Sequence, residues 1–223
     1  MKNTVICTFG SSIIEGTIGI TDPLDRWYNL LHRKLSGYFP KVCFSVINAG
    51  IGGESTRECM LRFERDVLAH SPDYLLVMAG ANNEDYTRPE RIVPLGEIQR
   101  HLEDMVNRLP GKTQIVGVGL SPVVNEWHWA AKHAAFEEPF RECGGGLDEL
   151  LEPQRELARR FFLSNNYPFL DLYPLFDRER RKYLLKDGIH LNRDGHQLFG
   201  ENMFSLLKNT ITQRDHNERT DVF

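Results

Sequence analysis

The sequence predicts an α/β fold, a three-layer α/β/α sandwich in which helices cover both faces of a five-stranded parallel sheet. Apolar, β-rich runs alternate with segments of helical spacing along the whole chain. The runs are almost continuously apolar, which is typical of parallel strands that are buried on both faces. A length of 223 residues is enough to bury one large core.

The expected strands are short apolar runs at residues 4–9, 42–48, 74–79, 114–120 and 168–173. Apolar stripes with helical spacing predict helices within residues 27–38, 95–109, 147–161 and 198–207. Asp22-Pro23 has the pattern of a cap followed by a first-turn proline, and Ser55 with Glu58 has the spacing of a capping box. Right-handed crossovers would connect these units. Because neither repeats nor linkers occur, we expect one domain over residues 1–211 and a polar C-terminal tail over 212–223, frayed from Thr212 to Asp221.

Composition excludes several classes of function. A net charge of −4 provides no general attraction to nucleic acid or to an anionic membrane. Apolar stretches stay well short of the ~20 residues that span a bilayer, and Met1-Lys2-Asn3 leads directly into a strand, so we expect no N-terminal signal. The cysteines are scattered, which favours buried thiols in a reducing compartment over a disulfide framework or a zinc site: Cys7, Cys43, Cys59 and Cys143. We therefore expect a cytoplasmic protein.

Polar and glycine-rich stretches follow the predicted strands. They are Gly10–Ser12, Asn48–Thr56, Ala79–Glu84 and, ahead of the final helix, Asp187–His196. Ligands of parallel α/β sheets bind beyond the carboxyl ends of the strands, so we expect these stretches to meet at one rim.

Together the four stretches contain what acyl transfer requires. A serine at a strand-to-helix turn exposes its hydroxyl, and Gly53 and Asn82 offer N–H donors to a developing oxyanion. His190 would accept the serine proton, and Asp187, three residues earlier, would orient the imidazole. Taken singly, each of these features has an ordinary explanation: a serine or glycine after a strand is typical of a turn, and an aspartate three residues before a histidine is common by chance. Their joint placement at strand ends, in this order, favours a hydrolase.

These motifs resemble the SGNH hydrolases, the GDSL-type esterase and lipase family, over essentially the whole chain. The first family block corresponds to Gly10-Ser11-Ser12 with Gly16, the second to the stretch with Gly53, the third to Gly80-Ala81-Asn82-Asn83 and the fourth to Asp187-Gly188-Ile189-His190. The resemblance implies a flavodoxin-like SGNH fold, with Ser12 rather than Ser11 as the nucleophile. It also implies an oxyanion hole of Ser12, Gly53 and Asn82, and a triad completed by Asp187 and His190. Neither a metal nor a cofactor is expected.

Two positions depart from the family pattern, because Ser11 and Asn83 stand where the family has aspartates. Neither residue is the implied nucleophile, base or oxyanion donor, so the chemistry should be preserved. Removing negative charge near the oxyanion would favour an anionic intermediate. The alternative is a rearranged loop with a changed substrate, or a site without turnover.

We therefore predict a serine esterase that hydrolyses carboxylic esters of a small molecule, a lipid or an acylated carbohydrate through an acyl-enzyme. An acyltransferase and a non-catalytic ligand-binding domain on the same scaffold remain alternatives. Acyl chain length, leaving alcohol and oligomeric state stay open at this point.

Other candidate residues have simpler interpretations. His196 is expected on a helix surface, and Glu15 and Glu54 as solvated loop carboxylates. Gly111-Lys112-Thr113 lacks the first glycine of a P-loop, since Val106 stands there. His128 and His133 are five residues apart, so on a helix they would not share a metal.

The longest connection, residues 123–150, has two readings. Trp127 and Trp129 could start a packed helix that Gly144-Gly145-Gly146 ends. Alternatively, the segment is a mobile flap that places the two tryptophan rings against the substrate.

Overall fold

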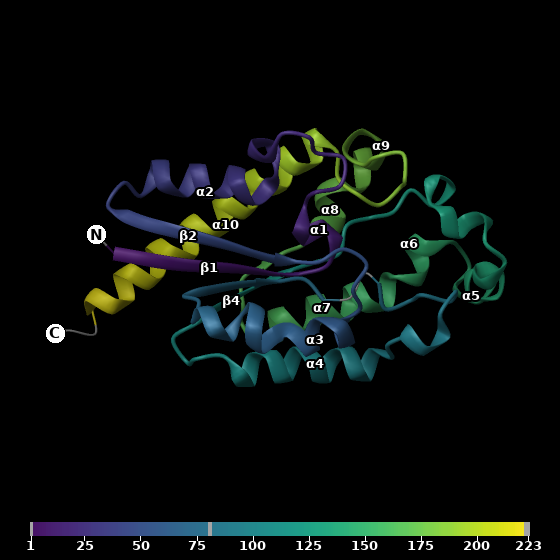
Figure 1. Ribbon diagram of the computed structural model, residues 1–223, viewed down its shortest axis with the longest axis horizontal. Helices are drawn as coiled ribbons and strands as arrows, with labels where there is room; N and C mark the ends of the chain where they lie inside the picture. Colours follow the sequence, from purple (N-terminus) through teal and green to yellow (C-terminus); the bar gives the residue numbers. More distant parts are fainter. Residues whose placement is uncertain (1, 80–81, 221–223) are drawn as a thin grey trace.

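The computed structural model describes residues 2–79 and 82–220, with side chains up to residue 214 in the last helix. Its centre is a five-stranded parallel sheet in the order β2-β1-β3-β4-β5 (Figure 1). The strands are β1 (Lys2–Gly10), β2 (Val42–Gly50), β3 (Tyr74–Val77), β4 (Gln114–Val118) and β5 (Phe169–Leu170). This arrangement, with helices on both faces, confirms the predicted fold class.

The last three strands end earlier than predicted, because pairing stops there. β4 and β5 are matched only at Gly117 with Phe169 and at Val118 with Leu170. Directly afterwards, the Asp171 carboxylate accepts the Tyr173 N–H at 3.2 Å and caps α8 (Leu172–Phe176).

One face of the sheet is covered by α2 (Trp27–Tyr38) and α10 (Arg193–Thr220) (Figure 1). The Trp27 ring stacks on Phe199 with centroids 4.3 Å apart, which joins these two helices. The predicted entry into α2 is present: the Asp22 carboxylate accepts the Leu24 N–H at 2.9 Å and caps the 3-10 turn η1 (Pro23–Asp25).

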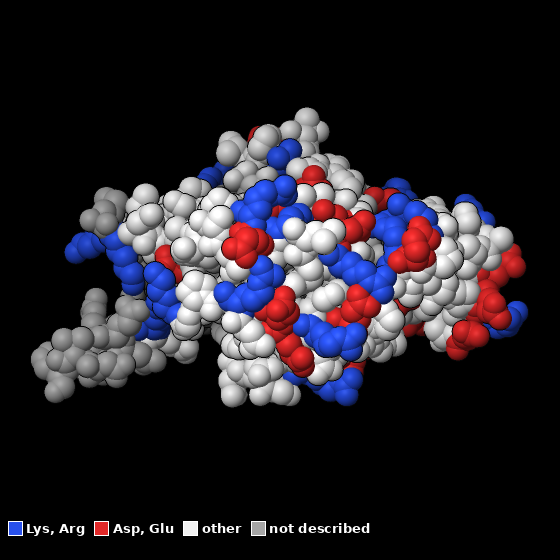
Figure 2. All heavy atoms as spheres, turned by 60° about the horizontal axis from the view of Figure 1, so that its bottom comes forward, with Lys and Arg blue, Asp and Glu red and all other residues white. Residues whose placement is uncertain are grey.

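The opposite face is covered by α3 (Thr56–Asp66), α4 (Leu95–Arg108) and α7 (Glu152–Ser164). The predicted capping box opens α3, where the Ser55 N–H donates to the Glu58 carboxylate at 2.7 Å. At Gly117 the sheet approaches α7 so closely that a Cβ would lie 2.3 Å from the Phe162 ring. Figure 2 shows positive and negative side chains interspersed on the face of the molecule that it presents.

Short elements fill the ends of the layers. They are α1 (Ser12–Glu15), η2 (Leu68–His70), η3 (Pro89–Arg91), η7 (Asp177–Glu179) and α9 (Arg180–Tyr183).

The connection over residues 123–150 is a chain of short turns. It contains η4 (Asn125–Trp127), η5 (Trp129–Lys132), η6 (Ala134–Phe136), α5 (Glu137–Cys143) and α6 (Leu147–Leu150). The reading that the tryptophans start one packed helix is therefore wrong, because 3-10 turns interrupt the segment. The prediction that the glycines end a helix is partly confirmed, since Gly144 ends α5 with a φ of 73°.

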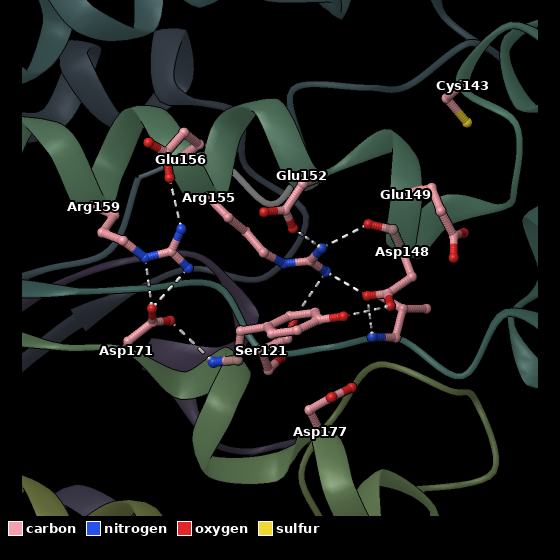
Figure 3. Close-up of polar contacts among 12 residues, drawn as sticks. Ser121, Cys143, Asp148, Glu149, Glu152, Arg155, Glu156, Arg159, Asp171 and Asp177 are labelled. Carbon is pink, nitrogen blue, oxygen red and sulfur yellow. Dashed lines mark hydrogen bonds and ion pairs between the residues drawn. The ribbon is translucent and has the colours of Figure 1, made fainter.

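Buried ion pairs hold the end of this connection against α7 (Figure 3). The Arg155 side chain, 1% exposed, donates to the Asp148 carboxylate and to the Asp148 carbonyl, each at 2.6 Å. It also reaches the Ser121 carbonyl at 3.2 Å, and Arg180 donates to the second Asp148 oxygen at 2.7 Å. Because removing one partner would leave a buried charge unpaired, these contacts anchor the segment to the body of the fold.

The expectation of a frayed end from Thr212 is wrong over the described residues, because α10 continues to Thr220. Ile211, directly before this segment, is 4% exposed and packs against the core, whereas Thr212 and Gln213 are exposed. The domain boundaries at residues 211 and 212 stay a prediction.

The cysteines carry free thiols, as expected, but burial is uneven. Cys7 and Cys59 are buried, and burial raises the pKa of each thiol to about 12, whereas Cys43 is exposed and Cys143 half-buried. Within the described ranges, none of the helices combines the length and apolar character that crossing a bilayer requires. A cytoplasmic location stays a prediction.

Candidate active site

The serine turn lies where β1 meets α1. Ser11 is buried at 4% exposure, whereas Ser12 begins the helix and is partly accessible. The end of β2 packs against this turn, and a Cβ at Gly50 would lie 2.2 Å from the Glu15 amide nitrogen. The close approach holds the first helical turn, and therefore the Ser12 hydroxyl, at the carboxyl ends of β1 and β2.

Three side chains form a continuous line of polar contacts. Ser12 Oγ lies 2.9 Å from His190 Nε2, and His190 Nδ1 lies 2.7 Å from Asp187 Oδ2. The other Asp187 oxygen accepts the backbone N–H groups of Ile189 and His190, each at 3.0 Å.

Electrostatics favour one proton arrangement in this line. Burial raises the pKa of the Asp187 carboxyl, but the two backbone hydrogen bonds and the His190 ring outweigh it and hold that pKa below its ordinary value. An ionised Asp187 accepts a hydrogen bond from a proton on His190 Nδ1, so Nε2 is left to accept the hydrogen bond of the Ser12 hydroxyl. This arrangement can remove a proton from the serine.

The structure brings Gly53 and Asn82 to the wall of one cavity of about 140 Å³. Gly53 has a φ of 77°, a left-handed conformation that favours glycine. The Asn82 amide nitrogen donates to the Glu54 carbonyl at 3.1 Å. Gly80 and Ala81, from the same sequence block as Asn82, lie outside the described residues.

The rest of the cavity wall combines rings and charges. Its described lining includes Trp129, which is 54% exposed, and Phe136, whose ring centroid lies 5.4 Å from that of Trp129. Burial raises the pKa of Glu84 and lowers that of His128, so a neutral imidazole lies on this wall. The lining as described does not include Trp127, whose ring centroid instead lies 3.7 Å from Lys186 Nζ. Of the two predicted aromatic residues, the structure thus brings one to the cavity.

Asn83, which departs from the family pattern, has a packing role. It is fully buried, and its side-chain oxygen Oδ1 accepts the Thr56 N–H at 2.9 Å at the start of α3. Its amide nitrogen donates to the Gln154 side chain at 3.3 Å. A position that must accept on one side and donate on the other suits an amide better than a carboxylate.

Three expectations from the sequence need correction. His196 is buried at 2% exposure and accepts the Trp27 N–H at 3.2 Å, so it does not lie on a helix surface. Glu54 pairs with the buried Arg62 at 2.5 Å, and Glu15 accepts the Gly52 N–H at 2.7 Å. Both carboxylates are therefore structural partners of the loop after β2.

Among the side chains that the structure describes, groups of three or more histidine, cysteine or acidic residues that could hold a metal ion do not occur. Independence from metals and cofactors stays a prediction.

A hydroxyl, an imidazole and a carboxylate aligned at the carboxyl ends of a parallel α/β sheet have the arrangement found in serine hydrolases. The sequence profile of the GDSL-like lipase/acylhydrolase family matches residues 8–198. The chain belongs to this family, which confirms the resemblance read from the sequence.

Individual relatives are more distant. The chain is 29% identical over 175 residues to the rat platelet-activating factor acetylhydrolase IB subunit alpha1, which covers 75% of this chain and 66% of the relative. It is 34% identical over 77 residues to an acetylxylan esterase of Geobacillus stearothermophilus, covering 32% of this chain and 35% of the relative. The chain thus spans only part of these curated relatives.

Solved structures share the fold. The lipase/acylhydrolase from Enterococcus faecalis superposes with a TM-score of 0.72 at 19% identity. The superposition covers 93% of this chain and 96% of that one, so the fold is the same from end to end.

Proposed function

We propose that this protein is a serine esterase that works through an acyl-enzyme. Ser12 Oγ attacks the ester carbonyl carbon while His190 Nε2 takes the hydroxyl proton and Asp187 stabilises the resulting imidazolium. The proton then passes to the leaving alcohol, and water, activated by the same imidazole, releases the acid. The observation that carries this proposal is the continuous line from Ser12 Oγ to Asp187, with contacts of 2.9 and 2.7 Å.

Stabilisation of the tetrahedral intermediate is assigned to three donors. They are the backbone N–H groups of Ser12 and Gly53 and the side-chain amide of Asn82. Support comes from the shared cavity wall of Gly53 and Asn82, with Ile189 beside His190 closing the same cavity. Asn82 would exchange its present contact with the Glu54 carbonyl for the oxyanion.

The proposed substrate is a small-molecule ester with a short acyl chain, and acetyl esters in particular. The cavity beside the proposed oxyanion donors has a volume of about 140 Å³, and its described lining includes Gly53 and Asn82 but not Ser12 or His190. This volume is smaller than the ~300–1,000 Å³ of pockets that take drug-sized ligands. Both curated relatives are named for action on acetyl groups, an acetylhydrolase and an acetylxylan esterase.

A series of nitrophenyl esters tests the proposal. Purified protein should hydrolyse nitrophenyl acetate with the highest kcat/KM, and the value should fall through butyrate to octanoate. Ser12→Ala should abolish turnover, whereas the matched control Ser11→Ala should retain it. Unchanged turnover in Ser12→Ala would disprove the mechanism, and a preference for octanoate would disprove the short-chain assignment.

A further inference from the structure

The loop of residues 51–55, which joins β2 to α3, carries the proposed oxyanion donor Gly53. We call it the oxyanion loop. Packing does little to fix Gly53, because a Cβ placed there would meet no described atom within 4 Å. A glycine without steric neighbours is the freest residue in a loop. Hydrogen bonds must therefore hold its N–H in the direction that catalysis needs.

Arg91, at the end of η3, forms a hydrogen bond with Gly53 directly. Its Nη2 donates to the Gly53 carbonyl at 2.6 Å and to the Glu58 carboxylate at 2.5 Å. Its Nη1 donates to Asp85 at 3.2 Å, and the side chain is 15% exposed. Three anchored contacts leave the guanidinium little freedom, so the Gly53 carbonyl is tied to a fixed point.

Arg62, on α3, ties the same loop to the nucleophile turn. Its Nη2 donates to the Gly10 carbonyl at 3.0 Å and its Nη1 to the Ala49 carbonyl at 2.7 Å. Its Nε donates to the Glu54 carboxylate at 2.5 Å. One side chain, 5% exposed, thus joins the last residue of β1, the end of β2 and the oxyanion loop.

The charge on Arg62 is retained in this position. Burial opposes it, but hydrogen bonds to the Glu54 and Asp66 carboxylates outweigh the burial and raise the pKa of the guanidinium. The planar fork of donors suits three acceptors that lie in different directions, which a lysine ammonium could not reach together.

We propose that Arg62 and Arg91 are positioning residues for ester hydrolysis. They hold the Gly53 N–H in the position where it can donate to the oxyanion that forms when Ser12 attacks. Arg91 acts through the Gly53 carbonyl, and Arg62 acts through the Gly10 and Ala49 carbonyls and Glu54. The inference rests on the proposed esterase function. Because a misplacement of about 1 Å costs on the order of 10²-fold in rate, loss of either anchor should slow the chemical step.

The experiment compares substrate turnover with binding of an oxyanion mimic. A trifluoromethyl ketone serves as the mimic: Ser12 Oγ adds to its carbonyl carbon, the carbonyl electron pair moves to oxygen, and the hydroxyl proton passes to His190. The resulting hemiketal oxyanion needs the same donors as the transition state. Arg91→Met should lower kcat for nitrophenyl acetate by ~10- to 100-fold and raise the inhibition constant by a similar factor. KM should stay within about twofold.

Further variants separate positioning from stability. Arg91→Lys keeps the charge but places its donors on a single nitrogen, so it should recover part of the loss. Glu54→Gln weakens the contact with Arg62, so it should lower kcat and raise the inhibition constant as Arg91→Met does, but by smaller factors. If Arg62→Met does not fold, Glu54→Gln tests the positioning role of Arg62 in its place. The matched control is Arg108→Met, because Arg108 lies over the Phe63 ring, as Arg62 lies over the Phe9 ring, and pairs with Glu64 at 2.7 Å. It should melt earlier with normal kcat.

The outcomes distinguish this inference from the proposed function. Wild-type kcat and inhibition constant in fully folded Arg91→Met would make Arg91 a structural residue and overturn its part of the inference. The same result in Glu54→Gln would overturn the Arg62 part. Absent turnover in the wild type, or unchanged turnover in Ser12→Ala, would instead overturn the esterase mechanism itself.

Discussion

Acid should destabilise this protein through His196, a buried histidine at the start of α10. Its Nδ1 accepts the Trp27 N–H at 3.2 Å, which only the neutral imidazole can do. Burial, together with the nearby positive charge of Arg26, lowers the pKa of His196 from 6.5 to about 4. The neutral form is therefore favoured in the folded protein.

The sign and size of the effect follow from linkage. Because the folded pKa lies below the unfolded one, the contribution of His196 is fully present above pH 6.5, falls progressively as pH drops from 6.5 to about 4, and is absent below that. The whole shift corresponds to roughly 3 kcal/mol of unfolding free energy, of which about 2 kcal/mol is lost by pH 5. For a chain of this length, that loss lowers the melting temperature by roughly 4–8 °C.

Denaturant unfolding at several pH values between 8 and 4.5 measures this contribution. His196→Asn keeps an acceptor for the Trp27 N–H but does not titrate, so its unfolding free energy should fall less steeply with acid than that of the wild type. His70→Asn, at an exposed histidine, controls for the loss of an imidazole and should follow the wild type. Parallel curves for the wild type and His196→Asn would refute the reasoning.

Three further predictions concern the active site. Asn82→Ala should lower kcat by ~10²-fold or more with an unchanged circular dichroism melt, because one oxyanion donor is removed; normal turnover with an earlier melt would make Asn82 structural. A fluorophosphonate should label Ser12 once per chain, as mapped by peptide mass spectrometry, and labelling should persist in Ser11→Ala but not in Ser12→Ala; the reverse result would move the nucleophile by one residue. Asp187→Asn should reduce kcat by ~10⁴-fold through the wrong imidazole tautomer, and steady-state rates near those of the wild type would contradict that role.

The sequence predicted the sheet and the meeting of the four strand-end stretches because both depend on local patterns. A run of apolar residues such as 74–79 has few alternatives to a buried strand, although the strand itself stops at Val77, two residues before the run ends. Parallel topology then brings those ends to one edge. Ser12, Gly53, Asn82, Asp187 and His190 could be named for this reason, together with a family resemblance specific enough to choose Ser12 over Ser11.

Residues whose roles depend on distant partners were missed or misread. Arg62 and Arg91 read as ordinary charged residues in the sequence, and their backbone acceptors Gly10, Ala49 and Gly53 carry no side-chain signal at all. The ion pair of Arg155 with Asp148 likewise reads as two charges on polar helices.

His196 shows most clearly what only tertiary structure decided. Its spacing of three and seven residues from Phe199 and Met203 places it on the buried face of α10, but that spacing does not identify a partner for the imidazole. The partner comes from α2, whose Trp27 lies 169 positions earlier in the chain and supplies the N–H that the imidazole accepts. Apolar periodicity is a local property that can be recognised in the sequence. The partner of a buried polar group, in contrast, depends on packing between elements that lie far apart in the chain.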